Sequence, residues 1–114
     1  MIVPASDVRI VLTTAGSREE AERMARALVE ERVAACVNIL PGLTSIYRWQ
    51  GAVETAGETL LVIKTTQASI SSLEAAIGRM HSYEVPELLV LTVESAGKPY
   101  LDWLLSEATP PEAG

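Results

Sequence analysis

The sequence of 114 residues lacks most features that mark nucleic-acid-binding, membrane or secreted proteins. It has one cysteine, so no internal disulfide can form, and this favours a reducing, cytoplasmic setting. Fifteen acidic residues outnumber nine basic ones, and the net charge of −6 argues against nucleic-acid binding. No apolar run approaches the ~20 residues that span a bilayer, and the N-terminus lacks the regions of a secretory signal. We therefore expect a cytoplasmic protein with neither nucleic-acid nor membrane partners.

Motifs of the common enzyme classes are also missing. There is no glycine-rich phosphate loop, no His-x-x-x-His pair and no Ser/His/Asp series with a nucleophile elbow. His81 is the only histidine, and a lone acid/base group supplies only part of a catalytic mechanism. We expect a protein that is not an enzyme.

The chain has the length and composition of one globular domain. Its hydrophobic content of 48% and charged content of 21% are ordinary for a folded chain that buries its own core. We expect a single domain over residues 1–107, followed by a flexible tail over residues 108–114 that is rich in proline.

Apolar periodicity predicts strands and helices in the order βαββαβ. Strands are expected at residues 8–13, 35–49, 52–65 and 88–93, and helices after Ser17, at 69–81 and, as a short C-terminal element, at 98–105. Ser17 and Glu20 form a capping-box pattern, in which the Glu20 carboxylate reaches back to the Ser17 amide. This order is the ferredoxin-like split arrangement, an α+β sandwich of one antiparallel sheet with two helices on one face.

The second and third strands predict a hairpin that is too long for the domain. At about 3.3 Å per residue it reaches roughly 45–50 Å, whereas a compact domain of this size has a radius of gyration near 13 Å. Pro41 and Gly42 interrupt the first of these strands and predict a bend or bulge. Because exposed apolar strand edges favour association, the hairpin predicts self-assembly.

Three residues are candidate metal donors. The thiolate of Cys36 suits soft ions, although a lone cysteine is often only a small buried hydrophobe. His81 lies near a helix C-terminus and could bind copper or zinc, with Glu84 on the same side if the helix continues. One chain supplies too few soft donors for a tight site, so we expect modest affinity for Cu(II) or Zn(II), with ligands gathered from several chains.

Aromatic and basic residues give a second set of candidates. Tyr47, Trp49 and Trp103 could stack on a ligand, but aromatic residues more often anchor interfaces between chains. Lys64 interrupts an apolar strand end, where a lysine usually extends to solvent or pairs with a carboxylate.

Five phrases of the sequence, in this order and at this spacing, form a recognisable set: AACVNI at 34–39, SIYRWQG at 45–51, LVIKTT at 61–66, HSYEVPEL at 81–88 and YLDWL at 100–104. Over residues 8–107 the chain resembles the CutA divalent-cation tolerance proteins. The resemblance implies a ferredoxin-like protomer in a PII-like homotrimer, with hairpins that pair between subunits. It also implies a role in tolerance of copper and other divalent metals.

The resemblance extends to the site residues. It implies that Cys36 is a metal ligand, and that a pocket at the subunit interface is lined by Asn38, Lys64, Tyr83, Glu84 and Trp103. The chain departs from the family pattern at Thr13, where some members have a cysteine, and at Ser82, where the family often has proline. Two hypotheses remain: a trimeric metal-tolerance protein, and a PII-like signalling or small-molecule module that binds metal incidentally.

Overall fold

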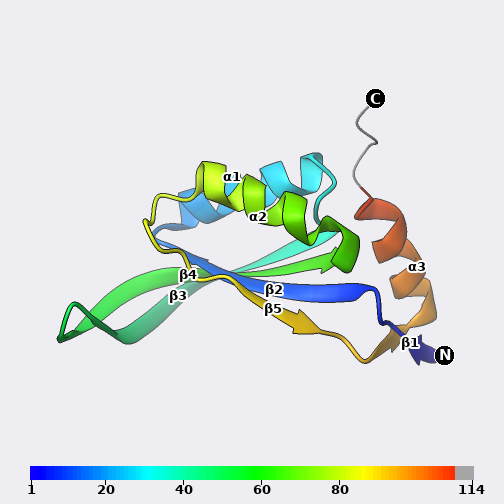
Figure 1. Ribbon diagram of the computed structural model, residues 1–114, viewed down its shortest axis with the longest axis horizontal. Coiled ribbons are helices and arrows are strands. Elements are labelled where there is room, and N and C mark those ends of the chain that lie inside the picture. The colour runs from blue at the N-terminus through cyan, green and yellow to red at the C-terminus, as the bar shows by residue number, and fades with distance from the viewer. Residues whose placement is uncertain (110–114) are drawn as a thin grey trace.

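The computed structural model describes residues 1–109. A four-stranded antiparallel sheet has the order β3-β4-β2-β5, and Figure 1 shows α1 and α2 together on one side of it. Its strands are β2 (Val8–Ala15), β3 (Cys36–Trp49), β4 (Ala52–Thr66) and β5 (Leu89–Thr92). Helix α1 spans Arg18–Glu30, and α2 spans Ile70–Met80 after the 3₁₀ turn Gln67–Ser69. The βαββαβ order and the ferredoxin-like α+β fold are thereby confirmed.

A smaller sheet joins the N-terminus to the C-terminal helix. Strand β1 (Ile2–Pro4) pairs antiparallel with β6 (Ser95–Gly97), and α3 (Lys98–Glu107) follows directly. The sequence analysis predicted neither strand, since three residues are too few to show a period. Ala108 belongs to the domain and not to a tail, because it is 2% exposed and its carbonyl accepts a hydrogen bond from Ser69 Oγ at 3.0 Å. Thr109 is exposed, and its hydroxyl donates to the Leu105 carbonyl at 2.7 Å, while residues 110–114 of the predicted tail lie outside the described residues.

The long hairpin has the predicted form. Beyond Thr59, which pairs with the last residue of β2, no other described strand accompanies β3 and β4, and Figure 1 shows their ribbon projecting beyond both helices. The register shifts between Leu40 and Leu43, and Gly42 has a φ of +82°, so the interruption at Pro41 and Gly42 is a β-bulge. The molecule measures 46 × 35 × 22 Å, and its radius of gyration of 15.0 Å exceeds the ~13 Å of a compact domain.

The main core lies between the helices and one face of the sheet. Residues at alternate positions of the strands are fully buried there, together with one face of each helix: Val11, Leu61, Ile63, Met24, Leu28, Leu73 and Ile77. The other face of the sheet is also apolar but is not covered by α1 or α2. Leu40, Leu89 and Leu91 on that face are 43%, 55% and 44% exposed. We call this the open face.

Candidate functional site

Polar side chains gather where the hairpin leaves the sheet. Strand β2 ends at Ala15, and the loop between α2 and β5 descends past this end from the helix layer to the sheet (Figure 1). The loop brings His81 against Thr14 of β2, the backbone of Ser82 against Glu20 of α1, and Tyr83 against Glu58 of β4. We call Thr14, Glu20, Glu58, His81 and Tyr83 the hairpin-root cluster.

His81 uses both of its ring nitrogens within the cluster. Nε2 lies 2.6 Å from the carbonyl oxygen of Thr14, and Nδ1 lies 3.0 Å from the backbone nitrogen of Tyr83. A carbonyl only accepts and a backbone N–H only donates, so Nε2 has the proton and Nδ1 accepts. The arrangement fits a neutral imidazole and leaves neither nitrogen with a free lone pair.

Tyr83 connects the loop to the base of the hairpin. Its hydroxyl donates to Glu58 Oε2 at 2.9 Å, and its ring lies 4.7 Å from that of His81. A Cβ on Gly16 would lie 3.2 Å from this hydroxyl, so the close approach favours glycine there. Burial, followed by the hydrogen bond and the negative charge of Glu58, raises the pKa of Tyr83 to about 12. The phenol therefore stays protonated and acts as a hydrogen-bond donor at neutral pH.

Glu20 joins the start of α1 to the end of α2. Its carboxylate accepts from the backbone N–H groups of Gly16 at 3.2 Å and Ser82 at 2.9 Å. The predicted bond from this carboxylate to the Ser17 amide is not formed, although Ser17 Oγ accepts from the Glu20 amide as a cap should. Burial opposes the charge, but hydrogen bonds from Ser82 and Gly16 outweigh it and lower the pKa of Glu20.

The three candidate metal donors do not meet in one protomer. Among residues 1–109, no three His, Cys, Asp or Glu side chains are grouped so that they could hold an ion. Cys36 pairs with Lys64, whereas His81 contacts Thr14 at the level of Leu60, roughly 13 Å away along the strands. The helix ends at Met80, and the ψ of 135° at His81 directs Glu84 away from a helical continuation. A metal site built from these residues therefore needs donors from other chains.

The predicted pocket residues are likewise dispersed. Asn38 is exposed and Lys64 half-buried on the open face, and within the described residues Lys64 forms no ion pair. On the hairpin, Tyr47 and Trp49 are 43% and 47% exposed. Trp103 of α3 borders a separate cavity of about 330 Å³ beside Arg32. Only Tyr83 belongs to the hairpin-root cluster.

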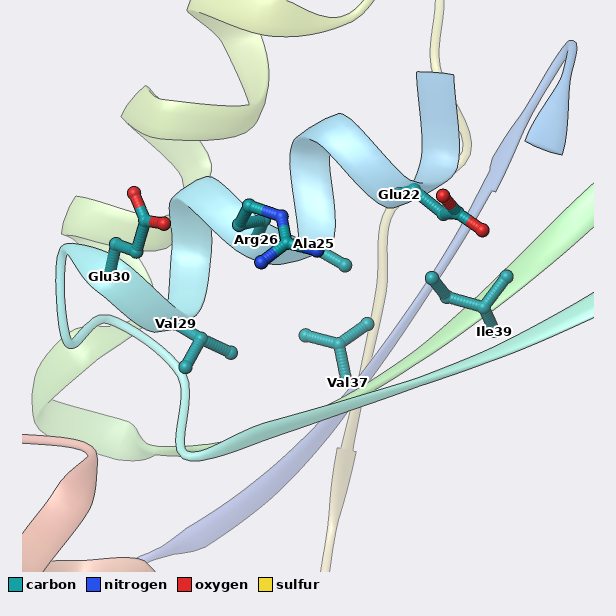
Figure 2. A pocket seen from close by; sticks show the side chains of 7 residues that line it. All are labelled: Glu22, Ala25, Arg26, Val29, Glu30, Val37 and Ile39. Carbon is teal, nitrogen blue, oxygen red and sulfur yellow. The ribbon is translucent and has the colours of Figure 1, made fainter. Parts of the chain in front are cut away.

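A groove that the sequence analysis missed runs between α1 and the edge strand β3. Figure 2 shows Val37 and Ile39 of β3 facing Ala25 and Val29 of α1 across a space of about 500 Å³. The charged side chains of Glu22, Arg26 and Glu30 border it. Among the described strands β3 has a neighbour on one side only, so the groove lies beside a free edge of the sheet. The alternation of Val37 and Ile39 could have indicated a covered strand face, but not that its cover is incomplete.

Comparison with known proteins identifies the family. A sequence model described as CutA1 divalent ion tolerance protein matches residues 9–107. The chain belongs to this family. It is 52% identical over 95 residues to the divalent-cation tolerance protein CutA of Thermus thermophilus, covering 83% of this chain and 92% of that one. It is 40% identical over 95 residues to the chloroplastic CutA of Arabidopsis thaliana, covering 83% of this chain and 52% of that one. The chain thus spans about half the length of that plant relative.

Solved CutA structures share the fold. The divalent cation tolerance protein of Thermus thermophilus superposes with a TM-score of 0.88 at 48% identity, covering 90% of this chain and 99% of that one. CutA from Synechococcus elongatus PCC7942 superposes with a TM-score of 0.92 at 38% identity, covering 96% of each chain. Both the family and the fold expected from the five sequence phrases are confirmed.

Glu20 and Glu58 of the hairpin-root cluster were not recognised as site residues from the sequence of this CutA protein. Glu20 had a visible signal, the capping pattern with Ser17, but its partner Ser82 is 62 residues away. Glu58 lies in a polar stretch of the hairpin that gives no reason to select it.

No helix among residues 1–109 has the length and apolar character needed to cross a bilayer.

Proposed function

We propose that this CutA protein is a homotrimer that binds divalent metal ions, copper or zinc, with modest affinity and acts in the cytoplasm in tolerance of them. We propose no catalytic reaction. Membership of a divalent ion tolerance family supports the link to metals. The observation on which the proposal chiefly depends is the open face, an apolar sheet surface that the protomer's two main helices leave uncovered.

Three features favour association through this region. The leucines exposed on the open face are unfavourable in water. Burying them against a second copy would stabilise the assembly by about 25 cal/mol per Å² of apolar surface. Strands β3 and β5 are both free edges of one sheet, so the edge of one copy can pair with that of the next. Such head-to-tail pairing closes into a ring if the rotation per copy permits. The apolar groove beside β3 would then accept side chains from the added strand.

Assembly also supplies a route to a metal site. Cys36 is half-buried, and its pairing with Lys64 places it on the open face. If that face packs against other copies, thiolates of several chains approach one another, and soft ions favour such donors. Glu84 is exposed and able to contribute an oxygen ligand from a neighbouring chain. Cys36 and Glu84 are therefore the two predicted donors whose ligating atoms remain available.

A pair of measurements tests the proposal. Multi-angle light scattering should report three times the 12.2 kDa mass of the chain, and a monodisperse 12.2 kDa particle would refute the trimer. Calorimetric titration of Zn(II) and Cu(II) should show binding that weakens in Cys36→Ala. Unchanged metal affinity in Cys36→Ala and Glu84→Gln would exclude these donors.

The second candidate function is a PII-like small-molecule module. It is favoured by the lack of a three-donor cluster in the described protomer and by the polar hairpin-root cluster. A related CutA from Synechococcus elongatus has been solved in complex with a Bis-Tris molecule. Thermal unfolding with metals and with nucleotides in parallel separates the two functions. A ligand at a hundredfold excess over its Kd stabilises by about 2.7 kcal/mol, so the functional ligand should shift the transition.

A further inference from the structure

We infer that His81 is a clasp that positions the loop after α2, and that it is not a metal donor of this protein. It is the only histidine in the chain and therefore the obvious ligand for copper or zinc. The inference depends on the contacts of its two ring nitrogens and stands whether or not the trimer binds metal.

The first contact fixes the ring to the sheet. Strand β5 pairs with β2 only as far as Leu12, so Thr14 lies beyond the end of that ladder. The Nε2–H of His81 donates to the Thr14 carbonyl at 2.6 Å, and thereby provides a side-chain donor at a strand edge that β5 no longer reaches. Thr14 and His81 are 67 residues apart, so this bond connects β2 to the end of α2.

The second contact connects the His81 ring, through Tyr83, to the base of the hairpin. Nδ1 accepts the backbone N–H of Tyr83 at 3.0 Å, which fixes the start of the loop. The Tyr83 hydroxyl can then reach Glu58, the residue of β4 that pairs with Leu43, the first residue after the bulge. Sheet, loop and hairpin base are therefore connected through one imidazole.

Metal coordination is incompatible with this arrangement. A metal ion binds the lone pair of an imidazole nitrogen, but that of Nδ1 is engaged by Tyr83 and Nε2 bears a proton. Binding at either nitrogen would break one of the two bonds and leave a half-buried backbone group without its partner. Both carboxylate oxygens of Glu20 already accept hydrogen bonds, from Gly16 and Ser82, and Glu58 Oε2 accepts one from Tyr83.

The single histidine permits a direct test on the wild-type protein. Two-bond ¹H–¹⁵N correlation of the imidazole distinguishes a protonated ring nitrogen from one that bears a lone pair. We expect a protonated Nε2 and an unprotonated Nδ1, both unchanged when Zn(II) is added at twice the protomer concentration. The opposite tautomer, or a Zn(II)-dependent shift of either nitrogen, would overturn the inference.

Variants separate the clasp from a ligand role. We expect His81→Ala to lower the midpoint of thermal unfolding by several degrees while the Zn(II) dissociation constant changes less than twofold. His81→Gln, whose amide can still donate to Thr14, should recover part of the lost midpoint. Tyr83→Phe should lower the midpoint while the His81 imidazole stays in place, because it removes only the hydroxyl that donates to Glu58. Glu74→Gln is the control, because Glu74 is exposed on α2 and belongs neither to the clasp nor to the proposed metal donors. A His81→Gln protein that loses a bound Zn(II) equivalent at an unchanged midpoint would refute the clasp.

Discussion

The two faces of the four-stranded sheet are similarly apolar but differ in how far their side chains are buried. On the helix-covered face, Leu61 and Ile63 are completely buried. On the open face, Leu60 and Val62 alternate with them along β4 and remain partly exposed. The strands are apolar on both faces, as strands covered on both sides are, yet the protomer has only enough helix for one. The helix-covered face is therefore completed within the chain, whereas the open face is the surface on which the proposed assembly depends.

The largest expected effect comes from the buried member of a neighbouring pair. Leu61→Ala should reduce the free energy of unfolding by about 2–5 kcal/mol, because it leaves a cavity between the sheet and the helices. Leu60→Ala is the matched control, since it removes the same atoms from the open face. Urea denaturation at a fixed protomer concentration measures both. Equal losses under conditions that keep the protein monomeric would contradict the difference between the faces.

A charge on the open face should disrupt assembly and leave the protomer folded. Leu40→Asp places a carboxylate where the proposed subunits meet, and should weaken association by about 3 kcal/mol, roughly 100-fold in the dissociation constant. Light scattering across a dilution series detects this change. Ala75→Asp adds the same charge to an exposed position of α2 and should not alter the mass. A Leu40→Asp protein that dissociates no more readily than Ala75→Asp would show that this face is not an interface.

Two buried threonines refine the description of the helix-covered face. Thr65 Oγ1 donates to the Val33 carbonyl at 2.6 Å, whereas Thr13 Oγ1 is the buried side-chain atom without a partner among the described residues. Thr13→Val should therefore stabilise the protein by about 1 kcal/mol, and Thr65→Val should destabilise it by about 1–2 kcal/mol. Both side chains are 0% exposed, so each variant is the control for the other. Thermal unfolding midpoints that move in the same direction would contradict the assignment.

The smallest effect concerns Glu20, a charge retained within the helix-covered half. The folded state lowers its pKa below the usual 4.5, so its contribution is complete above about pH 4.5 and is lost as the pH falls through the folded pKa. Glu20→Gln should cost about 1 kcal/mol at pH 7 and flatten the stability profile below pH 4.5. Glu19→Gln removes an exposed carboxylate from the same turn as a control. Profiles of equal slope for Glu20→Gln and the wild type would exclude this role.

Much of the fold was predictable because its elements are long and periodic. Strands β3 and β4 extend over 14 and 15 residues, and Pro41 and Gly42 mark the bulge through properties of the residues themselves. The β1–β6 pair was not predictable, since three-residue strands are defined only by their partner. The hydrogen bond of the Glu20 carboxylate was wrongly predicted for a related reason. A capping box would direct it to the nearby Ser17 amide, but here it accepts from the backbone N–H of Ser82, 62 residues away.

The sequence by itself determined the order of elements, the apolar character of both sheet faces and a hairpin longer than its domain, because these follow from local periodicity and residue type. Tertiary structure decided which donor atoms remain available. The sequence alone suggests that His81 is a metal ligand. In the fold, its Nε2 bonds to the carbonyl of Thr14, 67 residues away, and its Nδ1 bonds to the backbone N–H of Tyr83. Hydrogen bonds between segments so distant in the chain depend on the packing of helix, loop and strand, and no local pattern encodes them.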